Sequence, residues 1–281
     1  MPVAMLVDLR DLRLGLLLVA AVTAGCEESA AAPRPVASAK PVAAPVVSAK
    51  PPAPPCPADM AHVASFCIDR YEAHLTRADG AEHSPYERPK AGERYVAVSR
   101  AGVVPQGYVS REEAEAACAG AGKRLCRAVE WYRACSGAGG DAYPYGPKLE
   151  KGKCNVGKPH LLTKVFGHVF FTKLAHYNNP RVNQEPGFLA KTGEYSECVT
   201  DSGVFDMVGN LHEWVADDVS AKLIKEVPFE KGDQWFGKRG MGVFMGGYFS
   251  SHAEHGHGCR YATATHAPEY HDYSTGFRCC K

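Results

Sequence analysis

The sequence predicts a mixed α/β domain that contains much irregular structure and is cross-linked by several disulfides. Two observations lead to this fold class. The chain contains 28 glycines and 20 prolines, which mark many turns, and segments with a long helical or strand period are few. It also contains eleven cysteines, and in an exported protein such a number favours disulfides.

Residues 1–25 are typical of an export signal and are excluded from the fold. Two arginines precede an apolar run, 14–22, that is too short to span a bilayer as a helix. Small residues then precede Cys26 in the sequence TAGC, which resembles the lipobox of bacterial lipoproteins. The resemblance implies acylation of Cys26, and Glu27 in place of an aspartate implies the outer membrane. An ordinary secretory signal with a chance cysteine is the alternative.

Residues 26–55 are expected to be the lipid anchor and a linker. Eight of the 29 residues from 27 to 55 are proline, and PVASAKP is nearly repeated as PVVSAKP. Proline-rich chains are extended and semi-rigid at about 3.1 Å per residue, which gives a reach on the order of 90 Å. We therefore expect this segment to hold a domain away from a membrane.

Residues 56–281 are long enough for one domain with a well-buried core. The formal net charge of the chain is +1 and the sequence contains no basic patch, so nucleic acid is excluded as a partner. No second apolar segment of membrane-spanning length follows the signal. The expected location is the cell envelope, with the domain bound to the membrane through its lipid.

The ten cysteines after Cys26 form an even set, which predicts up to five disulfides. Their spacing leaves the connectivity open, although the adjacent Cys279 and Cys280 are expected to have different partners. Zinc is the competing interpretation, but no two close cysteine pairs have finger-like spacing. The set comprises Cys56, Cys67, Cys118, Cys126, Cys135, Cys154, Cys198, Cys259, Cys279 and Cys280.

Two helices are predicted. Ser110 and Glu113 have the spacing of a capping box, which marks a helix start. Small residues then recur at helical spacing, and Gly120 and Gly122 end the helix. A second, shorter helix is expected over 127–135, before a serine and a glycine. The small-residue face of the first helix comprises Ala114, Ala117, Cys118 and Ala121.

Six blocks, taken in order, resemble the formylglycine-generating enzyme (sulfatase-modifying factor) family. The resemblance implies the fold of that family, which is related to C-type lectins. Residues 157–189 and 219–239 match poorly and are expected to be loops. The blocks are FCIDRYE (66–72), GKRLC with EW (122–126 and 130–131), YPYG with CN (143–146 and 154–155), GVFDMVGNLHEW (203–214), GG (246–247) and GFRC (276–279).

The resemblance also shows where the oxidases of this family hold copper(I). They convert a cysteine of a sulfatase peptide to formylglycine with oxygen, and two cysteine thiolates bind the soft metal. Counted from the GG pair, these two positions are Ser251 and Gly256 here. If the segment is aligned on the following pair Arg260–Tyr261 instead, the first position still holds no cysteine. Cys259 then lies one residue beyond the second position. We therefore predict that the copper pair is lost and that no catalytic residue of the oxidases remains.

Cys259 has two interpretations. A structural disulfide with Cys279 or Cys280 is the first. The alternative is a lone reactive thiol that serves as the catalytic group, with Arg260 and nearby histidines as the neighbours that would lower its pKa.

Calcium is the cofactor that the resemblance implies, in a structural role. Its ligands in the family correspond here to Asn155 with the Val156 carbonyl, and to Asn210 with Glu213. Carboxamide, carboxylate and carbonyl oxygens are the hard ligands that Ca²⁺ takes. The alternative is that Asn210 and Glu213 only cap a helix, because the same spacing permits a cap.

The segment HAEHGHG belongs to this chain alone and lies where the copper pair would be. His252, His255 and His257 could ligate Zn²⁺, Cu²⁺ or Fe²⁺, with Glu254 or His266 as a further ligand. The alternative is a solvated loop without fixed geometry.

These observations predict a lipid-anchored envelope protein that keeps the family fold but is not an active formylglycine-generating oxidase. Its expected role is to bind a peptide, a glycan or an envelope protein. The alternative is a metal-dependent oxidoreductase that uses a non-standard site in the loop from His252 to Cys259. A purely structural envelope component is the third possibility.

Overall fold

The computed structural model describes residues 55–167, 173–235 and 237–281. The chain divides into two compact units, Met1–Pro51 and Pro52–Lys281, and the described residues all belong to the second. The predicted signal, Cys26 and nearly all of the linker lie outside the described residues. Among the helices that are described, none has the length and apolar character needed to cross a membrane.

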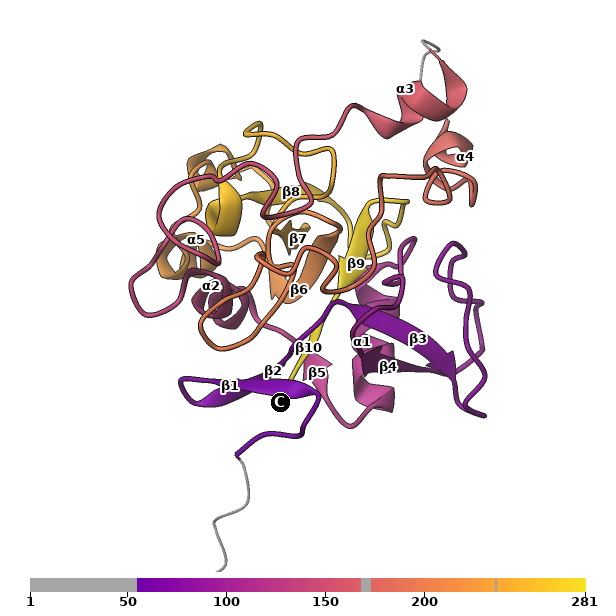
Figure 1. The fold of residues 1–281 in the computed structure, drawn as a ribbon, viewed down its shortest axis with the longest axis horizontal. Helices are drawn as coiled ribbons and strands as arrows, with labels where there is room; N and C mark the ends of the chain where they lie inside the picture. Colours follow the sequence, from indigo (N-terminus) through magenta and orange to yellow (C-terminus); the bar gives the residue numbers. More distant parts are fainter. Residues whose placement is uncertain (1–54, 168–172, 236) are drawn as a thin grey trace, which may run out of the picture. The chain divides into compact units, whose positions relative to one another are not determined.

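Three small sheets organise the described residues (Figure 1). The first has the strand order β1-β2-β10-β5, with β1 (Met60–Val63), β2 (Phe66–Asp69), β10 (Cys279–Cys280) and β5 (Arg124–Leu125). The second pairs β3 (Ala73–Arg77) with β4 (Tyr95–Ser99) in antiparallel register. The third has the order β8-β7-β6-β9, with β8 (Ala262–His266), β7 (Gly242–Met245), β6 (His212–Asp218) and β9 (Thr275–Phe277). In this last sheet β9 runs parallel to its neighbour β6, and the other two pairs are antiparallel.

The predicted capping-box helix is confirmed as α1 (Arg111–Gly120). The Ser110 hydroxyl accepts from the Glu113 amide, and the Glu113 carboxylate accepts from the Ser110 amide at 2.8 Å. The small-residue face packs on β4, and its buried members are Ala114, Ala117 and Cys118. At the C-terminal end, a Cβ on Gly120 would lie 2.4 Å from the Tyr95 carbonyl oxygen. A glycine is therefore required for this close approach of helix to strand.

The second predicted helix is confirmed as α2 (Ala128–Ser136), which ends at Gly137 with φ 62°. The two segments that were expected to be loops contain further short helices. They are α3 (Leu161–Phe166), α4 (Leu174–Tyr177), α5 (Ala221–Glu226) and the 3₁₀ turn η1 (Gly232–Trp235). The expectation was wrong for these residues. Three of the four turns bury apolar side chains, such as Leu161 and Leu162 of α3, Leu223 of α5 and Trp235 of η1. A final 3₁₀ turn, η2, spans Gly258–Arg260.

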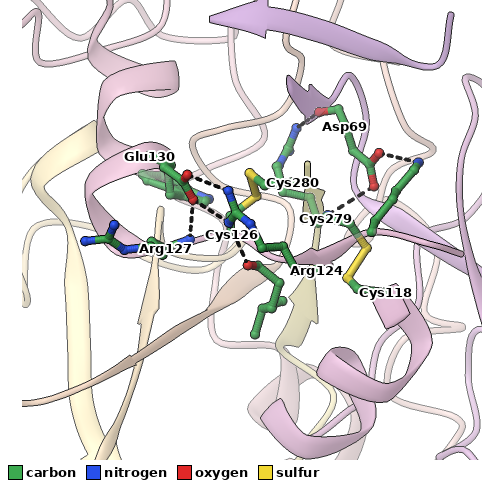
Figure 2. Close-up of a disulfide and its surroundings, with 12 residues drawn as sticks. Asp69, Cys118, Arg124, Cys126, Arg127, Glu130, Cys279 and Cys280 are labelled. Carbon is green, nitrogen blue, oxygen red and sulfur yellow. Dashed lines mark hydrogen bonds and ion pairs between the residues drawn. A yellow bond between two sulfur atoms is a disulfide. The ribbon is translucent and has the colours of Figure 1, made fainter. Parts of the chain in front are cut away.

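Five disulfides join the ten described cysteines, as predicted. The pairs are Cys56–Cys67, Cys118–Cys279, Cys126–Cys280, Cys135–Cys259 and Cys154–Cys198. Figure 2 shows the adjacent Cys279 and Cys280 bonded to different partners, as expected. Successive side chains of a strand point to opposite faces, so β10 reaches α1 with one cysteine and the start of α2 with the other.

Charged groups fix the same strand (Figure 2). Asp69, at the end of β2, is fully buried and accepts from the Cys279 amide at 3.0 Å. The Lys123 ammonium donates to the Asp69 carboxylate at 2.6 Å and also contacts Asp59. A buried carboxylate with a cation and a backbone donor is well compensated, so these contacts hold the C-terminal strand in the first sheet.

Candidate functional site

The segment that contains Asn210 leads directly into a β-strand. Asn210 has φ 59° and directly precedes Leu211 and β6, so the chain turns through a left-handed residue into the sheet. The alternative that Asn210 and Glu213 cap a helix is therefore wrong. Asparagine tolerates this conformation better than most residues, which explains its presence at the turn.

The Asn210 amide lies at the centre of a buried hydrogen-bond network. Its Oδ1 accepts from Asn155 Nδ2 at 2.8 Å and from the Ala190 amide at 3.0 Å. Its Nδ2 donates to the Glu72 carboxylate and to the Ala190 carbonyl. The structure thus brings Asn155 and Asn210 together, but the amide of Asn210 already has protein partners on both atoms.

Glu213 has different neighbours. Both of its oxygens accept from the Arg278 guanidinium at 2.6 Å, from Nε and from Nη2, and Trp131 Nε1 donates at 2.7 Å. The three side chains are all buried. A bidentate pair of this kind is strongly held and neutralises the carboxylate.

The predicted calcium ligands fit the ion only in part. Calcium takes six to eight oxygens, but the carboxylate of Glu213 is bound by Arg278 and the Oδ1 of Asn210 already has two donors. As placed, this pair does not fit a calcium site. Asn155 differs, because its Oδ1 is buried and has no hydrogen-bond partner among the described residues. Calcium at Asn155 and the Val156 carbonyl stays a prediction.

Ser251, which the resemblance aligns with the first copper cysteine of the family, is a buried hydroxyl. Ser251 Oγ accepts from the Tyr248 amide at 3.0 Å and donates to the Tyr261 hydroxyl at 3.2 Å. At the second position, Gly256 has φ +109°, and a Cβ there would lie 2.9 Å from the Arg260 carbonyl oxygen. The backbone at this position therefore disfavours any side chain.

Cys259 lies in η2 and is bonded to Cys135 of α2. The predicted structural disulfide at Cys259 is confirmed, but the suggested partners Cys279 and Cys280 are wrong, because they are bonded to Cys118 and Cys126. Since every cysteine between residues 55 and 281 is in a disulfide, the described chain holds no free thiol for chemistry at Cys259.

The three loop histidines do not converge. His252 and His257 line one cavity of about 210 Å³, whereas His255 lines another, and Tyr261 contributes to the walls of both. His257 Nδ1 instead contacts the Glu230 carboxylate at 2.8 Å. In the part of the chain that the structure describes, no group of three or more histidine, cysteine, aspartate or glutamate side chains is arranged to hold a metal ion.

The second of these cavities, here called the aromatic–histidine cavity, has a volume of about 250 Å³. Its walls come from β6, β7 and β8, from the segments that follow β7 and β8, and from the start of α3 and the end of α4. It borders Ser251, because the Ser251 hydroxyl donates to the hydroxyl of Tyr261 in its wall. The side chains that matter for its chemistry are five tyrosines (177, 248, 261, 270 and 273), four histidines (160, 212, 255 and 266), Glu254 and Asp272.

His212, the first residue of β6, forms an inner wall of this cavity. Its ring lies 4.6 Å from the Phe244 ring, 4.9 Å from Tyr248 and 5.6 Å from Tyr261, measured between centroids. It is 6% exposed, and its Nδ1 has no partner. Burial lowers the pKa of His212 to about 3, so the imidazole is neutral at pH 7.

Hydrogen bonds and stacking fix the outer wall. Tyr270 donates to Asp272 at 2.6 Å and stacks on His266 with 3.7 Å between ring centroids. The Tyr261 hydroxyl donates to Glu254 at 3.0 Å. Glu254, His255 and His266 were predicted only as possible metal ligands, and the cavity itself was not predicted. The signal that could have found it is the density of rings in HAPEYHDY, residues 266–273.

Comparison with known proteins identifies the family. The family description "Sulfatase-modifying factor enzyme 1-like domain" matches residues 42–281. The chain belongs to this family. It is 27% identical over 224 residues to the formylglycine-generating enzyme of Streptomyces coelicolor, covering 77% of this chain and 60% of that relative's length. The predicted family and the predicted fold class, mixed α/β with several disulfides, are confirmed.

Several solved structures are also similar to this chain. PvdO from Pseudomonas aeruginosa is 17% identical with a TM-score of 0.45, covering 76% of this chain and 79% of PvdO. CarF is 16% identical with a TM-score of 0.42, covering 77% and 85%. The P3c variant of the Major Tropism Determinant is 15% identical with a TM-score of 0.45, covering 82% and 54%.

Proposed function

We propose that this sulfatase-modifying factor domain binds a ligand in the aromatic–histidine cavity and does not carry out copper-dependent oxidation. The observation that supports this most strongly is the pair of positions where the family holds copper(I). Ser251 occupies the first with a hydroxyl that is already hydrogen-bonded, and Gly256 occupies the second.

The chemistry of the side chains at these positions supports the loss of the copper(I) site. Copper(I) is soft and selects thiolates, whereas a serine hydroxyl is a hard, protonated oxygen. The nearby Cys259 cannot replace a missing thiolate while it is bonded to Cys135. A cysteine at position 256 would also need a strained backbone, because of the positive φ and the close Arg260 carbonyl.

The cavity supports the binding role. Its ring-lined walls are fixed by hydrogen bonds and stacking, as in a preformed ligand site, and it lies beside the position where the oxidases of the family carry out their chemistry. The walls offer hydroxyl, imidazole and carboxylate groups, but no described thiol.

Oxygen consumption with a cysteine-containing peptide and copper(I) tests this function, with the Streptomyces coelicolor formylglycine-generating enzyme as the positive control. We expect no consumption above that of the heat-denatured chain. A thiol count on the unreduced, acylated protein should give zero. Peptide-dependent oxygen uptake by the native chain, or aldehyde formation on the peptide, would show that the proposal is wrong.

We also propose that Cys26 anchors the domain by lipid in the cell envelope, at the outer membrane, with residues 27–55 as the spacer. Five disulfides support an oxidising compartment, where such bonds persist. Replacement of Cys26 by serine should abolish incorporation of labelled palmitate and move the protein from the membrane fraction to the soluble fraction. The control Ser29→Ala should change neither. A Cys26→Ser variant that keeps the label would contradict the anchor.

A further inference from the structure

We propose that the aromatic–histidine cavity binds a small organic ammonium ion, an assignment that rests on the proposed binding function of this cavity. The charge of the walls, their aromatic faces and two polar atoms that the protein leaves without partners all favour such a ligand.

The charge of the lining favours a cation. Glu254 and Asp272 both line the cavity, and no lysine or arginine is among the described residues that do so. Asp272 accepts from the Tyr270 hydroxyl and from the amide and hydroxyl of Ser274. Burial acts to raise the pKa of Glu254, but hydrogen bonds from backbone amides and Tyr261 keep that pKa below its usual value. Both carboxylates are therefore suited to face a positive charge.

The histidines do not offset this charge at neutral pH. Burial lowers the pKa of His160, His212 and His266, so three of the four imidazoles in the walls stay neutral. The cavity is thus an anionic space with neutral aromatic walls. An anionic ligand would meet two carboxylates without a compensating cation, and burial of such a pair is costly.

The rings supply the second attraction. Tyr248, Tyr261 and Phe244 surround His212 with centroids between 4.6 and 5.6 Å from its ring. Tyr248 also meets Tyr273 edge to face at 5.9 Å. The faces of such rings attract cations within about 6 Å, and aromatic cages with carboxylates are a common way to bind ammonium groups. A volume of about 250 Å³ suits a ligand with one ring or a short chain.

Two buried polar atoms point to a ligand that carries hydrogen-bonding groups. His212 Nδ1 and Thr263 Oγ1 are buried without partners, and both residues line the cavity and are 6% exposed. Native proteins rarely leave such atoms unpaired, because each costs the desolvation of a polar group. A primary ammonium offers three donors and a positive charge, which no neutral alcohol or sugar matches.

The test compares two probes of the same shape. The full-length protein is titrated by calorimetry at pH 8 with 2-phenylethylamine, which is protonated, and with 2-phenylethanol, in which a hydroxyl replaces the ammonium. We expect the amine to bind at least tenfold more tightly than the alcohol. Methyl α-glucoside and phenylacetate serve as the sugar and the anion, and neither should compete with the amine.

A pair of matched variants locates the site. Glu254→Gln removes one carboxylate of the cavity and should weaken the amine at least fivefold, with little effect on the alcohol. Glu230→Gln removes a carboxylate that contacts His257 outside this cavity, and should leave the affinity for the amine unchanged. Thermal unfolding of both variants confirms that each is folded.

The outcomes separate the ligand class from the function. Equal affinity for amine and alcohol, preference for the glucoside, or failure of all four probes at millimolar concentration would overturn the ammonium assignment. If only Glu230→Gln weakened the binding of the amine, the amine would bind outside this cavity, and the ammonium assignment would be overturned as well. Copper-dependent oxidation of a cysteine peptide would overturn the proposed function instead, whatever the probes do.

Discussion

At the scale of single residues, the buried carboxylates around Arg278 carry more negative charge than one guanidinium can offset. Glu72, Asp206 and Glu213 are all buried, and Glu213 takes both hydrogen bonds of the bidentate pair with Arg278. Burial raises the pKa of Asp206 to about 6 and that of Glu72 well above its usual value. The folded protein therefore retains protons that the unfolded chain has already released.

Replacement of Asp206 by asparagine should change how stability depends on pH. A raised pKa in the folded state means that stability is present below the unfolded pKa of about 3.9 and is lost as the pH rises through about 6. Asparagine has no charge to bury, can accept from the Gly193 amide as Asp206 does, and tolerates the φ of 58°. We expect the free energy of unfolding of the variant, relative to that of the wild type, to rise by about 2 kcal/mol between pH 4 and pH 7.

Urea unfolding at four pH values between 4 and 7 measures this difference. Asp201→Asn, at an exposed carboxylate five residues away, is the matched control and should run parallel to the wild type. A difference between Asp206→Asn and the wild type that does not vary with pH would contradict a raised pKa.

Asn155 carries the part of the calcium prediction that the structure leaves possible. Because its Oδ1 is buried without a partner, a cation bound there would satisfy the oxygen. We expect 5 mM Ca²⁺ to raise Tm by a few degrees relative to EDTA, and magnesium to have a smaller effect. The Asn155→Ala variant should lose the response, and an equal Tm with calcium and with EDTA in the wild type would refute the site.

The sequence could identify these residues but not their partners. Asn155 and Asn210 meet although 55 positions separate them, whereas the resemblance placed them at two separate calcium sites. Glu213 was assigned to calcium because its oxygens are of the right kind. Its actual partner, Arg278, lies 65 positions away, and no local pattern connects the two. Residue chemistry can be predicted from sequence, whereas the choice between two suitable partners depends on the tertiary fold.

At the scale of elements, local signals were sufficient where local contacts decide the structure. The capping box of Ser110 and Glu113 predicted the start of α1, since both of its hydrogen bonds form within four residues. The same spacing in Asn210 and Glu213 permitted a helix cap, but the segment became β6 because it pairs with β7 and β9. Strand pairing is non-local, so it can override a cap signal.

The close approach of α1 to β4 gives a prediction for this element. An alanine at position 120 would place a methyl group 2.4 Å from the Tyr95 carbonyl, so helix or strand must move. We expect Gly120→Ala to lower the free energy of unfolding by about 1–3 kcal/mol, although alanine is the better helix former. Gly139→Ala is the control, because its Cβ would meet nothing nearer than 3.7 Å. Urea unfolding should show the control within about 0.5 kcal/mol of the wild type.

At the scale of the whole molecule, composition predicted the number of disulfides and the fold class, but not the connectivity or the cavity. Ten cysteines allow many pairings, and the partner of Cys259 proved to be Cys135 of α2. The aromatic–histidine cavity combines side chains from β6, β7, β8 and the segments after them with others from α3 and α4, and these meet only in the tertiary fold. The aromatic and charged residues can be identified in the sequence, but the tertiary fold decides which of them face one another.

The connectivity makes two of the disulfides partly redundant. Cys118–Cys279 and Cys126–Cys280 are neighbouring links between the same parts of the chain (Figure 2). While one is intact, the other closes a loop of only about ten residues, which corresponds to about 2.6 kcal/mol of chain entropy. When both are absent, the first to form must close a loop of about 40 residues through Cys135–Cys259, which corresponds to nearly 4 kcal/mol.

Removal of the two links should therefore be more than additive. We expect alanine at Cys118 and Cys279, or at Cys126 and Cys280, to lower the free energy of unfolding by about 2–3 kcal/mol each. Alanine at all four positions should cost about 1 kcal/mol more than the sum of the two pairs, because the longer loop is then left open. Urea unfolding of the three variants under non-reducing conditions measures this coupling. Strict additivity would mean that each link constrains the unfolded chain independently, which the shared short loop between residues 118 and 126 does not allow.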